Sequence, residues 1–109
     1  MKLLIAIVQD ADVNFLIDAL TEKGYRVTKL ATTGGFLKKG NTTLLIGVEE
    51  DNLDEVLGLI EKNCKKRNTT TTIINPSAES SLLTNTVPIE ISVGGATIFI
   101  VDVEKYIQL

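Results

Sequence analysis

The sequence contains no histidine and only one cysteine, Cys64. The absence of histidine removes the commonest metal ligand and the commonest general base near neutral pH. A single cysteine excludes an intrachain disulfide framework and a thiolate-rich metal site. Because Cys64 follows Ile60 at helical spacing, we interpret it as a small core residue rather than a nucleophile. These absences argue against an enzyme and predict neither a metal nor a cofactor.

Neither sign of charge is in large excess, and long apolar runs are also missing. The net charge of -3 provides no general attraction to nucleic acid or to membranes. The apolar run Leu3–Val8 is shorter than the roughly 7–15 residues of a signal-peptide core, and Gln9 and Asp10 follow it without a small-residue cleavage site. We therefore expect a cytoplasmic protein that binds neither a nucleic acid polymer nor a membrane.

The length and composition indicate one globular domain spanning residues 1–109. A hydrophobic content of 44% with 23% charged residues is typical of a soluble protein with a real core. The chain is nevertheless small enough that assembly into a multimer would increase its stability.

The first half of the chain alternates between strand and helix patterns. Leu3–Val8 is an unbroken apolar run of strand length. A helix stripe formed by Val13, Leu16, Ile17 and Leu20 follows, with Asp10 or Asp12 as its cap and Gly24 as its stop. Tyr25–Thr32 alternates as a strand, and Asn41–Glu49 is expected to return beside it as a hairpin. On the first of these two strands, one face carries Arg26, Thr28 and Leu30.

The second half begins with another helix and ends with a predicted hairpin. Asp51 is expected to cap the helix, whose apolar stripe consists of Leu53, Val56, Leu57, Ile60 and Cys64. We interpret the cations Lys62, Lys65, Lys66 and Arg67 as a solvated helix end that complements the helix dipole. Asn68–Thr86 is polar and nearly uncharged, which predicts a long, mobile loop. Ile89–Val93 and Ala96–Val101 are predicted to form a hairpin closed at Gly94-Gly95, and Glu104–Leu109 a short tail.

This order of elements predicts an α+β protein with a ferredoxin-like βαββαβ sandwich. Two β-α units joined by a hairpin place both helices on one face of an antiparallel sheet. The other face then exposes apolar side chains, and we expect a second subunit to cover it.

The segment Thr32–Thr43 combines glycines, an aromatic residue, two lysines, and hydroxyl and amide side chains. This mixture suits a nucleotide, although an ordinary hairpin loop explains it equally well. Gly35, Gly40 and Thr42 fit a P-loop, but Asn41 replaces its lysine. A strand rather than a helix follows, so we reject an NTPase.

Several segments resemble the PII-like cyclic-di-AMP receptor family of bacteria, over essentially the whole chain. The segments that carry the resemblance are Ile5–Asp10, Arg26–Leu37, Gly40–Thr43 and Val93–Thr97. Relative to true nitrogen-regulatory PII proteins, the first loop is short, at Gly34–Gly40, and the loop after the second helix is long.

The resemblance implies a homotrimer with ferredoxin-like subunits, and one cyclic-di-AMP molecule in each cleft between subunits. It implies a signalling protein whose loops change conformation and regulate a partner, which the sequence does not identify. No catalysis is implied. The residues expected to bind the ligand are Arg26, Thr28, Gly35, Phe36, Leu37, Asn41, Gly47, Phe99 and Gln108.

The chemistry of these residues is consistent with a ligand that has two adenines and two phosphates. Arg26 and Thr28 suit phosphate or base contacts. Phe36 and Leu37 would pack on an adenine, and Asn41 can read an adenine edge. Gly47 lies in mid-strand, where glycine is favoured if something approaches the backbone closely. Phe99 and Gln108 would come from the same cleft or from the neighbouring subunit.

Residue spacing alone leaves other roles open for several of these residues. Arg26 could equally be a solvated residue on an edge strand, Phe36 a loop anchor in the core, and Asn41 a turn former. Without the resemblance, Phe99 would be assigned to the core and Gln108 to the tail. A PII-type sensor of ATP and a metabolite is the second functional hypothesis, weakened by the short first loop.

Overall fold

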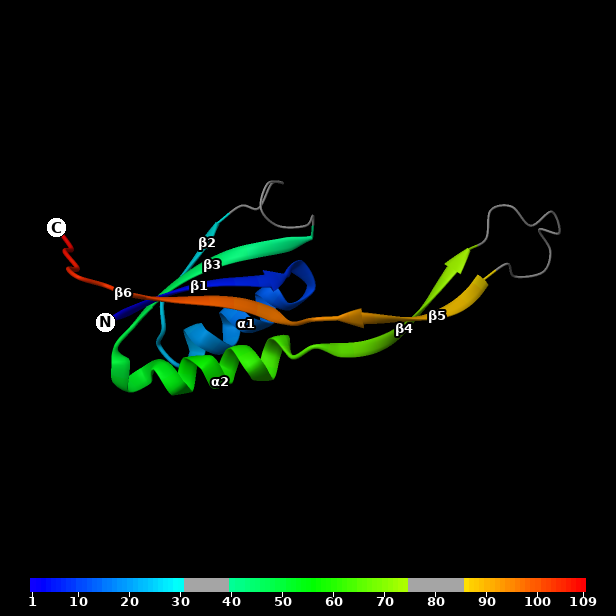
Figure 1. Ribbon diagram of the computed structural model, residues 1–109, viewed down its shortest axis with the longest axis horizontal. Coiled ribbons are helices and arrows are strands. Elements are labelled where there is room, and N and C mark those ends of the chain that lie inside the picture. Colours follow the sequence, from blue (N-terminus) through cyan, green and yellow to red (C-terminus); the bar gives the residue numbers. More distant parts are fainter. Residues whose placement is uncertain (31–39, 75–85) are drawn as a thin grey trace.

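A computed structural model describes residues 1–30, 40–74 and 86–109 of the chain. Its elements alternate much as the sequence pattern predicts, with one additional strand after the second helix (Figure 1). In chain order they are β1 (Lys2–Gln9), α1 (Asp10–Glu22), β2 (Val27–Leu30), β3 (Asn41–Val48), the 3₁₀ turn η1 (Glu50–Asn52), α2 (Leu53–Cys64), β4 (Arg67–Ile74), β5 (Thr86–Val93) and β6 (Ala96–Asp102).

Four strands form an antiparallel sheet in the order β2-β3-β1-β6. The most apolar strand, β1, lies inside this sheet, where both of its edges are paired. Both helices lie on one face of the sheet (Figure 1). This arrangement is the ferredoxin-like sandwich, so the predicted fold class is confirmed.

The core lies between this face of the sheet and the two helices. Alternate residues of β1 and β3 enter it, and the apolar stripes of both helices meet them. Cys64 is only 1% exposed, which confirms its assignment to the core. The core residues are Leu4, Ala6, Val8, Leu44, Ile46 and Val48 from the sheet, and Val13, Leu16, Leu20, Val56, Ile60 and Cys64 from the helices.

The opposite face of the sheet, which we call the open face, is apolar along its centre. The strand register places Ile5, Leu45 and Phe99 side by side on this face, because Ile5 pairs with both of the others. Phe99 is 46% exposed and Val101, two residues along β6, is 45% exposed. The expectation of an uncovered apolar face is therefore met in the isolated chain.

The prediction of a hairpin between residues 89–93 and 96–101 is wrong. β5 pairs with β4, from Arg67 opposite Val93 to Ile74 opposite Thr86, while β6 pairs with β1. Gly94 and Gly95, with φ of +86° and +91°, carry the chain from one sheet into the other instead of reversing it. A Cβ on Gly94 would lie 2.5 Å from the Lys65 carbonyl oxygen, so this passage requires glycine.

The predicted loop Asn68–Thr86 is strand wherever the structure describes it, and this too is a correction. Residues 68–74 belong to β4, and Thr86 begins β5. The threonines were read as loop because they are polar, yet they are β-branched and favour extended backbone. The pair β4–β5, which we call the ribbon, extends away from the sandwich (Figure 1). Strands in that position do not have to present an apolar face to a core. The remainder, residues 75–85, lies outside the described residues.

The predicted helix caps differ as well. Gln9 is the N-cap of α1 and Asn52 that of α2, and neither makes a side-chain capping bond. Asp51 lies within η1. Asp10 instead accepts a hydrogen bond from the Thr42 hydroxyl at 2.5 Å, because α1 begins where β3 also begins. The predicted stop is correct: α1 ends at Glu22, and Gly24 follows with a φ of +89°.

Candidate functional site

A hollow of about 910 Å³ lies at the end of the sheet where β2 begins and β3 ends. Three of the predicted ligand residues, Arg26, Thr28 and Gly47, line it together. The C-terminal segment after β6 also contributes to its wall. The other lining residues are Met1, Leu3, Lys23, Gly24, Tyr25, Leu45, Val48, Glu49, Asn52, Glu55, Val103 and Tyr106.

Strand register explains why Arg26 and Thr28 reach this hollow. Thr28 pairs with Leu45 of the open face, whereas Val27 pairs with Ile46 of the core. Arg26 precedes Val27 and is exposed. Within the described ranges, the Arg26 guanidinium makes no ion pair or hydrogen bond with the protein. It therefore offers five donors to an anionic group that enters the hollow.

Gly47 of β3 lines part of the hollow. It is exposed, and a Cβ built on it would meet nothing within 4 Å. Packing within the described chain therefore does not demand glycine there. The space above β3 allows a flat group to approach the backbone closely, as the mid-strand glycine predicts.

Tyr106 was not predicted from the sequence, although it lines the hollow and is 62% exposed. Its hydroxyl donates a hydrogen bond of 3.3 Å to the Gln108 Oε1 atom. Gln108 thus lies next to a residue that lines the hollow. The available signal was an aromatic residue in a polar tail, a combination that is common at binding surfaces.

Two predicted residues lie elsewhere on the open face. Asn41 pairs with Gln9 at the opposite end of β3 from Gly47, about 20 Å away at the rise of a strand. Phe99 is on β6, with β1 and β3 between it and β2, about 14 Å away at the usual strand spacing. A single chain therefore does not bring all the predicted residues into one pocket. Gly35, Phe36 and Leu37 lie outside the described residues.

The rim of the hollow carries charges of both signs. Lys23 and Arg26 face Glu49 and Glu55 around its mouth. The Tyr25 hydroxyl donates a hydrogen bond of 2.9 Å to Glu55. Partial burial, together with this bond, raises the pKa of Tyr25 above its ordinary value. The mixed charges and the donors suit a polar small molecule.

The described part of the chain provides neither a metal site nor a membrane-spanning helix. Residues 1–30, 40–74 and 86–109 contain no group of three acidic, cysteine or histidine side chains placed to hold a metal ion. Among the helices described here, none has both the length and the apolar character needed to cross a bilayer.

Comparison with known proteins gives consistent results. A curated relative, the nitrogen fixation nifHD region GlnB-like protein 1 of Methanothermococcus thermolithotrophicus, is 37% identical over an alignment 81 residues long. The match covers 62% of this chain and 77% of the relative. A solved structure, that of a functionally unknown protein from Pediococcus pentosaceus ATCC 25745, superimposes with a TM-score of 0.77 at 42% identity, covering 99% of this chain and 96% of the other.

The family comparison covers the whole chain. The model of the family described as cyclic-di-AMP receptor matches residues 1–109. Together with the GlnB-like relative, it supports the predicted PII-like relationship and a role in signal transduction. On this evidence the chain belongs to the cyclic-di-AMP receptor family.

Proposed function

We propose that this protein binds cyclic-di-AMP in clefts between the subunits of a homotrimer and passes the signal to a protein partner without catalysing a reaction. The observation that carries the proposal is that the predicted ligand residues lie in separate places on the open face, which is apolar and uncovered in the single chain. Arg26, Thr28 and Gly47 share one hollow, whereas Asn41 and Phe99 lie on the same face but do not line it. Contact between open faces would bring the separated residues of different subunits together.

The roles follow from the chemistry of the ligand. The Arg26 guanidinium and the Thr28 hydroxyl are suited to a phosphate, because charge-assisted hydrogen bonds to phosphate are strong and directional. Tyr106 offers a ring for one adenine, and Gln108 beside it offers an amide for the adenine edge. Asn41 and Phe99 supply the same two functions from a neighbouring subunit.

Isothermal titration calorimetry with cyclic-di-AMP, cyclic-di-GMP, ATP and AMP tests this function. The proposal requires that cyclic-di-AMP bind much more tightly than the other three. Preference for ATP would favour the PII-type sensor of ATP and a metabolite, and turnover of any of the four would indicate an enzyme.

Arg26→Ala is the variant that tests the site itself. A charge-assisted hydrogen bond is worth about 1.5–3 kcal/mol, so we expect roughly a ten- to hundredfold loss of cyclic-di-AMP affinity. Lys29→Ala is the matched control, since Lys29 pairs with core-facing Leu44 on the other face of β2 and its loss changes the net charge equally. Equal affinities for the two variants would show that the ligand does not use this face of β2.

A further inference from the structure

A second hollow, of about 670 Å³, lies at the base of the ribbon between the first turns of α1 and the end of α2. It shares no residue with the hollow on the open face. Because it lies beside the helices, subunits that associate through their open faces would leave it accessible (Figure 1). We call it the basic groove, and its lining residues are Ala11, Asp12, Phe15, Lys62, Asn63, Lys65, Lys66 and Arg67.

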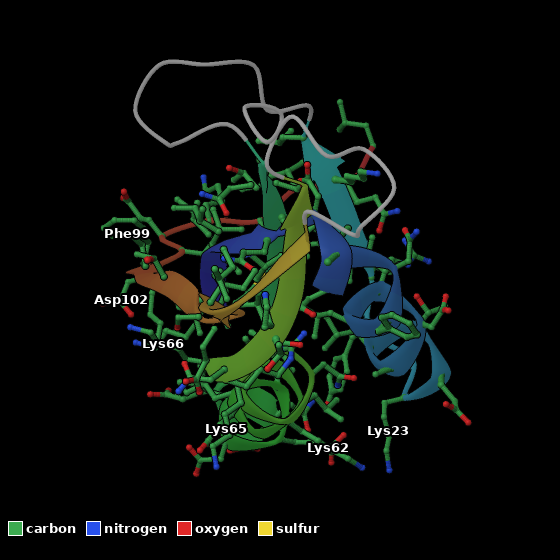
Figure 2. The ribbon with its side chains drawn as sticks, turned by 90° about the vertical axis from the view of Figure 1, so that its right-hand side faces the viewer. Lys23, Lys62, Lys65, Lys66, Phe99 and Asp102 are labelled. Carbon is green, nitrogen blue, oxygen red and sulfur yellow. The ribbon has the colours of Figure 1, made fainter. Side chains whose placement is uncertain are left out.

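The groove is strongly cationic in a chain whose net charge is -3. Its only acidic residue, Asp12, already accepts a hydrogen bond of 2.8 Å from Arg67. The three lysines are exposed, and within the described residues none of them makes an ion pair. In Figure 2 these lysines surround the end of α2. Four basic side chains therefore line the groove, against one carboxylate that is already paired.

An exposed aromatic residue distinguishes this groove from an ordinary helix end with solvated cations. Cations near a helix C-terminus stabilise it through the dipole, which accounts for Lys62 in the last turn. The dipole does not account for Phe15, which lies on α1 across the groove with 68% of its surface exposed. Exposed aromatic residues are enriched at interaction surfaces, and the unpaired lysines around this one add an attraction for negative charge.

We propose that the basic groove docks an acidic segment of a partner protein, with carboxylates on the lysines and an apolar side chain on Phe15. Charge complementarity selects this occupant. The net charge of -3 opposes a long polyanion or an anionic membrane, whereas a short acidic segment senses mainly the local patch. This inference rests on the proposed function, because it names the chemistry of the partner that receives the signal.

The position of the groove at the base of the ribbon would make the binding of its occupant depend on the orientation of the ribbon. Arg67 begins β4 and donates both to Asp12 and, at 3.0 Å, to the Lys65 carbonyl oxygen. The other side of the junction is held by the Gly94 amide, which donates to Gln9 Oε1 at 2.7 Å. A docked carboxylate would meet the exposed part of Arg67, so it would contact the sandwich and the ribbon base together.

The test uses a fluorescently labelled peptide of alternating glutamate and leucine, with a lysine-leucine peptide as the probe of opposite charge. Fluorescence anisotropy is measured with the full-length protein at low and physiological salt. We expect the acidic peptide alone to bind, with affinity falling as salt rises. Failure of the acidic peptide to bind the wild-type protein, or equal binding of both peptides, would overturn the proposal.

Charge and apolar contact are then tested separately. Lys62→Glu with Lys65→Glu should weaken binding about tenfold or more, since each exposed pair contributes modestly and both signs are reversed. Lys29→Glu with Lys105→Glu makes the same charge change at exposed positions outside the groove, and should change affinity far less. Phe15→Ser should weaken binding without altering its salt dependence. An equal loss in both double variants, or no loss with Phe15→Ser, would place binding elsewhere.

Titration of the same proteins with cyclic-di-AMP keeps the two proposals distinguishable. A wild-type protein that binds the nucleotide but not the acidic peptide contradicts the groove and leaves the sensor intact. The reverse result contradicts the sensor and leaves the groove intact. Circular dichroism of each variant verifies that the helices beside the groove remain folded.

Discussion

Adjacent residues on β3 serve opposite faces of the sheet. Leu44 is fully buried in the core, whereas Leu45 is half-buried on the open face. Leu44→Ala should lower the free energy of unfolding by about 2–5 kcal/mol, because it leaves a cavity among packed side chains. Leu45→Ala should act mainly on association, so its stability loss should depend on protein concentration. Urea unfolding at several concentrations separates the two effects, and identical behaviour would contradict the assigned faces.

Cys64 makes stability depend on alkaline pH. Burial, reinforced by the charge of Asp12, raises the pKa of its thiol to about 11, from an ordinary value of 9.0. Between these two values the unfolded chain loses the thiol proton while the folded chain keeps it. The stabilising contribution is therefore complete below pH 9.0 and is lost as pH rises through about 11.

Urea unfolding between pH 8 and pH 11 should show this decline, and Cys64→Ala should lack that part of it. Iodoacetamide should react slowly with the folded protein at pH 8 and quickly in urea, because only the thiolate is the nucleophile. Rapid alkylation of the folded protein would contradict the burial of Cys64.

Sequence reasoning performs well where a side-chain pattern corresponds to one buried face. The helix stripes and the strands β1 and β3 have such patterns, and alternation alone placed Arg26 and Thr28 on one side of β2. Thr69–Thr72 are all polar, so no alternation of apolar and polar residues indicates a strand there and the pattern predicts a loop. The pair Gly94-Gly95 suits a hairpin turn as well as a crossing between sheets, and only the pairing of β6 with β1 decides between them. Tyr106 was missed because an aromatic ring in the tail, the available signal, does not show that the tail lines a hollow.

At the scale of elements, the ribbon should be less stable than the sandwich. An isolated two-stranded ribbon is marginal in water, and this one lies away from the core. Its base is fixed by Asp12, which is 3% exposed and pairs with Arg67. One oxygen of Asp12, Oδ2, is buried with no partner among the described residues. The orientation of the ribbon therefore depends on few contacts.

Asp12→Asn should loosen the base of the ribbon, because it replaces a charge-assisted bond with a weaker neutral one. Hydrogen exchange should accelerate in β4 and β5 near Arg67 and Val93, while the amides of β1 and β3 keep their protection. Asp18→Asn, an exposed position on the same helix, provides the control. Unchanged exchange in the ribbon would mean that the ion pair does not hold it.

At the scale of the whole molecule, association through the open face gives a direct prediction. Val101 and Ile100 are neighbours on β6, each 45% exposed, but Val101 pairs with Leu3 of the open face and Ile100 with core residue Leu4. The wild-type protein should sediment at three times the mass of one chain at micromolar concentration. Val101→Asp should dissociate it, because a buried unpaired charge is costly, whereas Ile100→Asp should not. A monomeric wild-type protein would remove the intersubunit site as well.

The pairing of β1 with β6 also has a consequence for how the nascent chain folds. Lys2 stands opposite Asp102 and forms an ion pair with it, so two of the most distant segments of the chain become neighbours. Contacts of such long sequence separation slow folding, because a large loop must close before they form. Until residues 96–102 have been synthesised, β1 can pair with β3 but keeps one unpaired edge. During that interval the unpaired N–H and C=O groups along this edge of the apolar strand β1 can pair with strands of other chains. Misassembly should therefore be most frequent while several unfinished chains are close together.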